Sequence, residues 1–363
     1  MRACGCELHV APTHTPTKNY ISANYIPSKM ISLRDADLLV NCTSQDQPDL
    51  HHLRWVVYQV VFPVLVSLGV VANLLNLIVL SRPAMRGVAY RYLNHLAVSD
   101  LLYLVFNVPF CMRDFAYISE MKMVSKPSAV YYANVGIPLV NMFLTMSEYI
   151  VVWLSYDRCL AVCSPRKFSA KQRLEVVRIR CSMSLLLTMF VYSLSPLRQT
   201  YHCEGVECCV TESEYADEPW YMGYEFFREI YSRFLPAMLV TAFNVAIVVT
   251  LKQIKRGREG PDVTNEAREE RERRLFFLLM AITVLFYISA FPSAIYKVLM
   301  FNDMTFIPYF RAVADVLEVS GHVFNFVLYF LFSPDYRKTL VDMIYPHQHY
   351  NNEFAMSSTA IPL

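Results

Sequence analysis

Several ionisable side chains stand inside strongly apolar runs of this 363-residue sequence. If these runs cross a membrane, each buried charge costs at least about 2.5 to 3.5 kcal/mol, so each requires a partner or a function. Buried carboxylates of this kind are suited to binding a cation or to holding an arginine. The residues are Asp100, Glu148, Glu229, Arg233, Asp315 and Glu318.

Two of these acids, Asp315 and Glu318, are three residues apart and therefore share one face of a helix. They fit the floor of an acidic pocket that accepts an arginine of a ligand. The alternative is that they pair with Arg311 or Arg233 of the chain itself. Glu229 and Arg233 stand at i and i+4 in the favourable order, so an ion pair between these two is a further alternative to ligand binding.

A charged pair, Asp157 and Arg158, ends the apolar run at about 130–154. This run is long enough to cross a hydrocarbon core of ~30 Å, which places the pair at one membrane face. Taken alone, Arg158 fits a side chain that extends to the interface. Glu148 lies about 15 Å along the same helix and acts either as a neutral hydrogen-bonding group or as a switch.

The composition indicates the kind of fold that holds these residues. Hydrophobic residues make up 55% of the chain and charged residues 18%, and the mean hydropathy is +0.30, which argues against an ordinary soluble fold. The net charge of +2 is too small to suggest a nucleic-acid partner. Seven apolar stretches follow a polar tail, at about Trp55–Leu80, Tyr92–Met112, Val130–Val162, Val177–Pro196, Tyr221–Leu251, Leu275–Phe301 and Phe306–Phe332.

Backbone groups in lipid must be satisfied within each segment, so these stretches predict helices. The sequence therefore predicts an all-α membrane protein, a seven-transmembrane helix bundle with a short amphipathic eighth helix that opens at Pro334. We expect an N-terminal tail at 1–53, the bundle at 54–333, and the eighth helix with a short tail at 334–363. Prolines inside the spans predict kinks at Pro109, Pro138, Pro236 and Pro292.

Basic residues predict the orientation of the bundle. They gather in one set of loops, which the positive-inside rule assigns to the cytoplasm, so we expect a plasma-membrane protein with its N-terminus outside and its C-terminus inside. The glycosylation sequon at Asn41 agrees with an outer N-terminal tail. The loop at 197–220 carries six acidic residues against the single Arg198, so the outer mouth is expected to attract a cationic ligand.

An ordered set of motifs runs through the spans: Asn76 in the first, NHLAVSDLL (94–102) in the second, Asp157-Arg158-Cys159 in the third, Pro236 in the fifth, Phe291-Pro292 in the sixth and NFVLY (325–329) in the seventh. This set resembles the rhodopsin-like (class A) G-protein-coupled receptors. Asn325-Phe326 and the stretch 161–165 further resemble the invertebrate FMRFamide- and myosuppressin-type neuropeptide receptors. The departures from the family pattern are Cys159 after the arginine, Ala290 in place of a tryptophan, and a fourth span without tryptophan.

The resemblance implies a receptor, not an enzyme, that binds an extracellular ligand and activates a heterotrimeric G protein. We expect a cationic amidated neuropeptide, such as one ending in Arg-Phe-amide, as the ligand, with arrestin and membrane lipid as further partners. The implied coupling and switch residues are Asp157, Arg158, Tyr329, Asn325, Phe286 and Pro292. The candidate ligand-binding residues are Asp315, Glu318, Asn141 and Glu229.

The resemblance also implies a metal site. In the family, the acid that matches Asp100 binds a sodium ion together with residues that map to Ser147 and Asn325. The alternative is a structural carboxylate that is hydrogen-bonded and hydrated but holds no ion. No other cofactor is implied.

The cysteines depart from the family pattern. Most members join the outer end of the third helix to the next outer loop by a disulfide, but the matching position here is Ala133. We expect instead that Cys111, at the outer end of the second span, pairs with Cys203 of the acidic loop. The alternative confines the bridges to the loop and tail and keeps Cys111 as a thiol in an apolar setting.

Other classes of membrane protein fit less well. An opsin requires a lysine in the seventh span, and none occurs between Phe306 and Phe332. A transporter would more often show internal repeats and Gly-interrupted half-helices, whereas this chain has nine glycines and no evident repeat. The remaining alternative is a chemosensory or other small-molecule receptor on the same fold.

Overall fold

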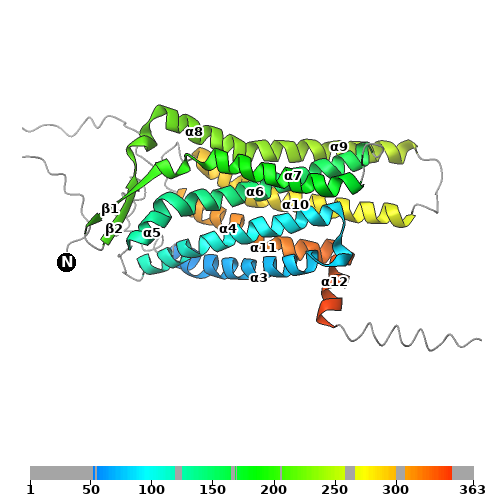
Figure 1. The fold of residues 1–363 in the computed structure, drawn as a ribbon, viewed down its shortest axis with the longest axis horizontal. Helices are drawn as coiled ribbons and strands as arrows, with labels where there is room; N and C mark the ends of the chain where they lie inside the picture. Colours follow the sequence, from blue (N-terminus) through cyan, green and yellow to red (C-terminus); the bar gives the residue numbers. More distant parts are fainter. Residues whose placement is uncertain are drawn as a thin grey trace, which may run out of the picture.

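The computed structural model describes residues 52–53, 55–118, 125–164, 168, 170–204, 207–257, 266–299 and 307–345. In these residues, long helices run side by side in one bundle, with a β hairpin at one end and helix α12 at the other (Figure 1). We call these the hairpin end and the α12 end. The predicted seven-helix bundle is confirmed; Asn41 lies outside the described residues.

The helical segments follow the predicted apolar runs. In chain order they are η2 (Trp55–Val61) with α3 (Phe62–Leu80), α4 (Val88–Ile118), α5 (Lys126–Val130) with η4 (Tyr131–Gly136) and α6 (Ile137–Cys163), α7 (Ala170–Tyr192), α8 (Pro219–Glu229) with η8 (Ile230–Phe234) and α9 (Leu235–Gly257), α10 (Glu266–Leu299), and α11 (Ile307–Phe332). The predicted eighth helix is α12 (Pro334–Ile344).

The fourth helix of the bundle, α7, differs from the others in composition. Among the described residues, six helical segments are long and apolar enough to cross a membrane, and α7 is not one of them. Its first half carries charged residues, including Glu175, Arg178 and Arg180, so an uncharged run begins only at Cys181. Helix α7 nevertheless packs against α4 and α6, which places it in the bundle.

Prolines shape three of the long segments. The π-helical turns η2, η4 and η8 each end two residues before a proline, namely Pro63, Pro138 and Pro236. A proline has no N–H to donate and its ring collides with the carbonyl one turn earlier, so the turn before it widens. Pro109 and Pro292 lie inside α4 and α10.

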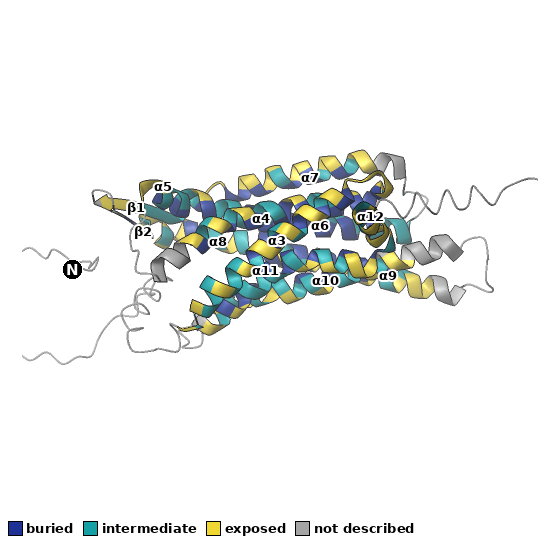
Figure 2. Ribbon diagram, turned by 90° about the horizontal axis from the view of Figure 1, so that it is seen from below, coloured by how far each residue is buried: buried dark blue, intermediate teal, exposed yellow. Residues whose placement is uncertain are grey.

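Helix α6 lies at the centre of the bundle and packs against α4, α7, α9 and α10, while α11 contacts both α3 and α10. Buried residues follow the faces that turn inward, and exposed residues follow the outer faces (Figure 2). Large apolar side chains such as Leu68, Phe190 and Met238 are exposed on these outer faces. A lipid environment would cover such surfaces, because water-exposed apolar patches of this extent are rare.

An antiparallel hairpin, absent from the all-α prediction, crosses the hairpin end. Strand β1 (Gln199–Glu204) pairs with β2 (Glu207–Glu212), and helix α5 packs against both strands. Asn134 anchors the first strand by donating to the carbonyls of Pro196 (3.1 Å) and Gln199 (3.4 Å). Arg198 binds Glu225 and Glu212; burial disfavours its charge, but these carboxylates outweigh the burial and raise the pKa of Arg198.

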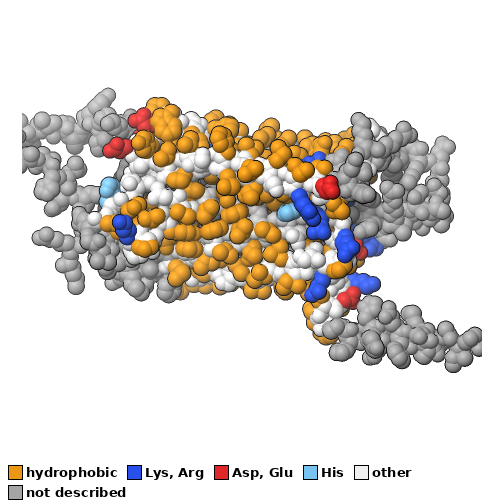
Figure 3. All heavy atoms as spheres, viewed as in Figure 1, with side chains coloured by type: hydrophobic (Ala, Val, Ile, Leu, Met, Phe, Trp, Pro, Cys, Tyr) orange, Lys and Arg blue, Asp and Glu red, His pale blue; other side chains and the backbone are white. Residues whose placement is uncertain are grey.

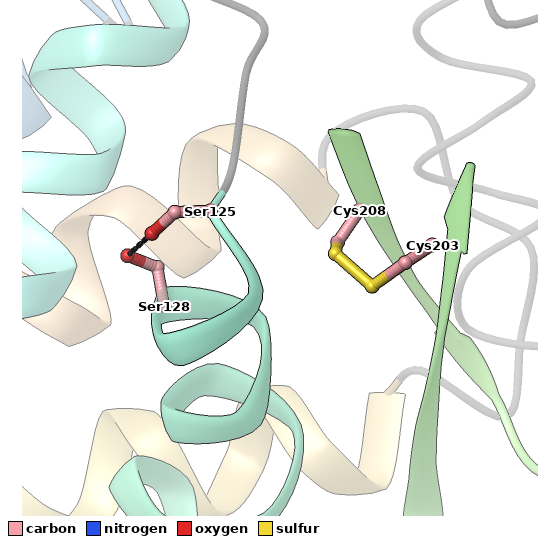
Figure 4. Close-up of a disulfide and its surroundings, with 4 residues drawn as sticks. All are labelled: Ser125, Ser128, Cys203 and Cys208. Carbon is pink, nitrogen blue, oxygen red and sulfur yellow. Dashed lines mark hydrogen bonds between the residues drawn. A yellow bond between two sulfur atoms is a disulfide. The ribbon is translucent and has the colours of Figure 1, made fainter. Parts of the chain in front are cut away.

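The hairpin corrects the expected disulfide between Cys111 and Cys203. Cys203 is bonded to Cys208, its direct partner in the strand register (Figure 4). Opposed side chains of an antiparallel pair lie close together, so the bridge forms within the loop. Cys111 is buried in an apolar cluster with Val66 and Leu104, as the alternative expected. In the same view, the hydroxyls of Ser125 and Ser128 at the start of α5 lie 3.0 Å apart.

Helix α12 turns away from the bundle axis (Figure 1) and is fixed at its first turn. Ser333 caps it by accepting a hydrogen bond from the backbone N–H of Tyr336 at 3.2 Å. The Tyr336 hydroxyl donates to Oδ1 of Asn76 in α3 at 2.7 Å, and Tyr90 donates to Asp335 at 2.9 Å. These contacts tie α12 to the first and second helices of the bundle.

Candidate functional site

The middle of the bundle holds one fully buried carboxylate, Asp100 of α4. Its Oδ1 accepts a hydrogen bond from Ser147 at 2.7 Å and lies 2.8 Å from Nδ1 of His322, while its Oδ2 accepts from Asn325 at 2.7 Å. The three residues grouped by the sequence therefore meet. His322 was missed; its signal was its place three residues before Asn325, on the same face of α11.

The residues around Asp100 carry the ligand atoms that sodium prefers, but His322 already occupies part of the carboxylate. Asp100, Ser147 and Asn325 carry oxygens, which hard cations prefer, and would hold the ion. Both oxygens of Asp100 are already engaged, and His322 shares Oδ1 with Ser147. An ion at this carboxylate would have to compete with the imidazole of His322, and sodium binding stays a prediction.

A second charged layer lies about 10 Å nearer the hairpin end, seven residues before Asn325 on α11. Here Glu318 accepts a hydrogen bond from Arg233 of η8, with 3.0 Å between Nη2 and Oε2. The hydroxyl of Tyr103 donates to the other oxygen of Glu318 at 3.5 Å, and Glu229 approaches Nε of Arg233 to 4.0 Å. Arg233 is only 5% exposed. An ion pair thus joins the fifth and seventh helices inside the bundle.

The other candidate ligand residues lie nearer the hairpin end or bond within their own helix. Asp315 accepts from the hydroxyl of Tyr58 at 2.8 Å and lies 3.8 Å from Nε of Arg311. Asn141 donates to the carbonyl of Ile137 at 2.8 Å. The structure thus contains the internal pairs that the sequence left open for both acids of α11, and contact with a ligand stays a prediction.

A cavity of about 50 Å³ separates the two charged layers. This is room for a few water molecules. On one side the cavity is bounded by small residues, Ser289, Ala290 and Gly321, and Ala290 is the position where the family pattern has a tryptophan. Its remaining lining includes Asp100, Glu148, Arg233, Phe286, Glu318 and His322.

Glu148 of α6 is 4% exposed and lines the same cavity as Arg233. Because both side chains line this cavity, an ionised Glu148 would attract the guanidinium of Arg233. Sequence reasoning identified Glu148 as unusual but did not place it near Arg233. The candidate switch residue Phe286 is buried and faces this cavity too.

At the α12 end, Asp157 is held by two other helices. Its Oδ1 lies 2.6 Å from Nη1 of Arg180 in α7, and its Oδ2 accepts from the hydroxyl of Tyr92 in α4 at 3.0 Å. The guanidinium of Arg180 also lies over the rings of Trp153 and Tyr156, 4.9 and 5.0 Å from their centroids. Sequence reasoning did not identify Arg180, at the start of the predicted fourth span, as the partner of Asp157.

The other predicted switch residues lie at the same end or nearby. Arg158 follows Asp157 on α6 and is partly buried. Tyr329 of α11 is fully buried, with its ring centroid 5.8 Å from that of Tyr336 in α12. Pro292 lies within α10. The structure therefore does not gather all six switch residues at one point but distributes them from the cavity to the α12 end.

Seven helices around a buried polar centre, with a charged pair at one end, define a seven-helix membrane receptor. A family model described as "7 transmembrane receptor (rhodopsin family)" matches residues 42–329, and the chain belongs to this family of receptors, which are not enzymes. A probable G-protein coupled receptor of Caenorhabditis elegans is 27% identical over 305 residues, 79% of this chain and 69% of that protein.

Two relatives are named for peptides. The chain is similar to the allatostatin-A receptor of Bombyx mori, with 24% identity over 299 residues that cover 79% of each chain. It is also similar to an FMRFamide peptide receptor of Caenorhabditis elegans, with 25% identity over 329 residues, 82% of this chain and 72% of the relative.

Proposed function

We propose that this receptor binds a cationic, amidated peptide at its hairpin end and activates a heterotrimeric G protein at its α12 end. The observation that carries this proposal is the group of acids, Asp315, Glu318 and Glu229, on α11 and α8 in the hairpin half of the bundle. A peptide arginine can form paired hydrogen bonds with such a carboxylate. The two relatives named for peptides support the ligand class.

The proposed orientation places the hairpin outside the cell and α12 inside, at the plasma membrane. On the face shown in Figure 3, lysine and arginine side chains gather toward the α12 end, and hydrophobic side chains cover the middle. The positive-inside rule assigns such a basic end to the cytoplasm. Lipid would then surround the apolar middle, and the G protein and arrestin would meet the α12 end.

Coupling in this proposal depends on Arg158 and Tyr329. Asp157 is neutralised by Arg180 on α7, so the inner ends of α6 and α7 are joined at rest. Activation would rearrange this end and expose Arg158 to the G protein. Tyr329, packed against Tyr336, would transmit the movement of α11 to α12.

A small-molecule receptor on the same fold is the second candidate. It is favoured by the pairing of the acids with the chain's own arginines, Arg233 and Arg311, which leaves less negative charge for a ligand.

A signalling assay separates the two candidates. Cells that express the chain, and mock-transfected cells, are challenged with the peptide Phe-Met-Arg-Phe-amide and with its analogue in which neutral citrulline replaces arginine. Calcium and cAMP are recorded. If the ligand is a cationic peptide, the arginine form should produce a response and the citrulline analogue should not. Activation by small odorants without any response to Arg-Phe-amide peptides would establish the alternative.

A further inference from the structure

Arg233 is an internal cation in a site that is otherwise acidic. Glu318 and Glu229 contact its guanidinium at 3.0 and 4.0 Å, and Glu148 lines the same cavity as Arg233. With the three carboxylates ionised, one positive charge faces three negative ones, so the cluster has a net charge of −2. A second cation that entered this cluster would lower the electrostatic repulsion among the carboxylates.

One nitrogen of the Arg233 guanidinium could form a further hydrogen bond. Nε and Nη2 face Glu229 and Glu318, but Nη1 is buried and has no hydrogen-bond partner among the described residues. Arg233 also lines the cavity that Glu148 lines. A buried donor without an acceptor is unfavourable, so a rotation that brought Nη1 to a carboxylate or to water in the cavity would satisfy it.

The sequence provides room for this rotation. Ala290 lines the cavity, and the family pattern has the much larger tryptophan at this position. Arg233 also lies on η8, the π-helical turn ahead of Pro236, where the regular helical hydrogen-bond pattern is interrupted. A small change in this turn can therefore redirect the side chain.

Glu318 is joined to the centre of the receptor through aromatic contacts. Tyr103 donates to Glu318, and its ring lies 4.2 Å from the imidazole of His322, centroid to centroid. His322 in turn contacts Asp100 at 2.8 Å. A chain of three contacts, through Tyr103 and His322, therefore connects Glu318 to Asp100.

We propose that Glu318 and Tyr103 form a cation-binding subsite that Arg233 fills in the unliganded receptor, and that a guanidinium or ammonium group of the ligand displaces Arg233 toward Glu148. The inference rests on the proposed function. Asp315, one turn nearer the hairpin end on the same face of α11 and partly exposed, is the first carboxylate that the incoming cation meets. Arg233 then determines specificity, because a neutral ligand cannot replace its charge at Glu318.

The exchange predicts opposite effects for the two members of one ion pair. Arg233→Gln removes the competitor, so Phe-Met-Arg-Phe-amide should bind and signal about tenfold more potently, with raised basal signalling. Glu318→Gln removes the subsite and should weaken the same peptide at least ~30-fold, also with raised basal signalling. Arg198→Gln is the matched control: this arginine pairs with Glu212 and Glu225, neither of which belongs to the proposed subsite, and the variant should leave potency unchanged.

The exchanged pair, Arg233→Glu with Glu318→Arg, protects the test against misfolding of the single variants. It restores the ion pair, so basal signalling should return to the wild-type level at equal surface expression, while peptide potency stays low because the acid has moved to η8. A fall in potency in both single variants, or an unchanged potency in Arg233→Gln, would contradict the proposed displacement of Arg233 by the ligand. If no cationic peptide acts on the wild type, the proposed function itself is contradicted, so the two failures are distinguishable.

Discussion

Asp100 joins three helices through one carboxylate, since Ser147 lies on α6 and both His322 and Asn325 lie on α11. Replacing it with alanine leaves these buried groups without their acceptor. We expect Asp100→Ala to lower the free energy of unfolding by about 3 kcal/mol, and Asp100→Asn to lower it less because one acceptor oxygen remains. Thermal unfolding of the detergent-solubilised receptor should rank the apparent Tm values in that order, and equal Tm values would contradict this account.

Arg180 is a second residue with a testable structural role. Asp157 is 1% exposed, so Arg180→Ala removes the charged partner of a buried acid and should cost about 3 to 5 kcal/mol. Arg180→Lys keeps the charge but loses the planar contact with Trp153 and Tyr156, so its cost should be smaller. The two variants are compared by the same unfolding measurement. If lysine is as harmful as alanine, the ring contacts and not the charge hold the site.

The family motifs allowed Ser147 and Asn325 to be predicted as partners of Asp100, whereas the third partner, His322, was not predicted. The sequence also kept the correct pairs, Glu318 with Arg233 and Asp315 with Arg311, among its alternatives. It could not predict Arg180 as the partner of Asp157. Which basic residue reaches a carboxylate on another helix depends on how the helices are rotated against each other, and local spacing carries no such information.

At the scale of elements, the apolar runs predicted correctly which segments form helices, but they predicted the helix ends less well. Helix α10 begins at Glu266, well before the predicted start at Leu275, and α7 ends at Tyr192, before the predicted end at Pro196. Hydropathy marks the thickness of the hydrocarbon layer, whereas a helix continues into the polar region as long as its backbone bonds are favourable. The hairpin was missed because its acidic strands carry no regular apolar alternation.

The hairpin makes a prediction about cysteines. Because Cys203 and Cys208 form one bridge, Cys203→Ser, Cys208→Ser and the double variant should all lower stability equally, by about 2 kcal/mol for a loop of this size. Cys111→Ser should not abolish the bridge. Mass-spectrometric mapping of the disulfides, together with unfolding of each variant, tests both points. A peptide in which Cys111 is linked to Cys203 would restore the original expectation.

At the scale of the whole molecule, the proposed orientation makes Asn41 extracellular. A receptor with this topology carries a glycan there, so a glycosidase that removes N-linked sugars should increase the gel mobility of the wild type and leave Asn41→Gln unchanged. Antibody labelling of N-terminal and C-terminal tags on intact cells provides the independent readout. Labelling of the C-terminal tag without permeabilisation would reverse the assignment of the two ends.

The central claim is that a cation bound at the hairpin end controls a G protein at the α12 end through the charged centre of the bundle. Arg158→Ala tests it most directly in membranes with matched receptor surface levels and Phe-Met-Arg-Phe-amide as the agonist. We predict that the wild type accelerates nucleotide exchange on the G protein, and that Arg158→Ala binds the peptide with unchanged affinity but loses this stimulation. Undiminished exchange in Arg158→Ala would contradict the account.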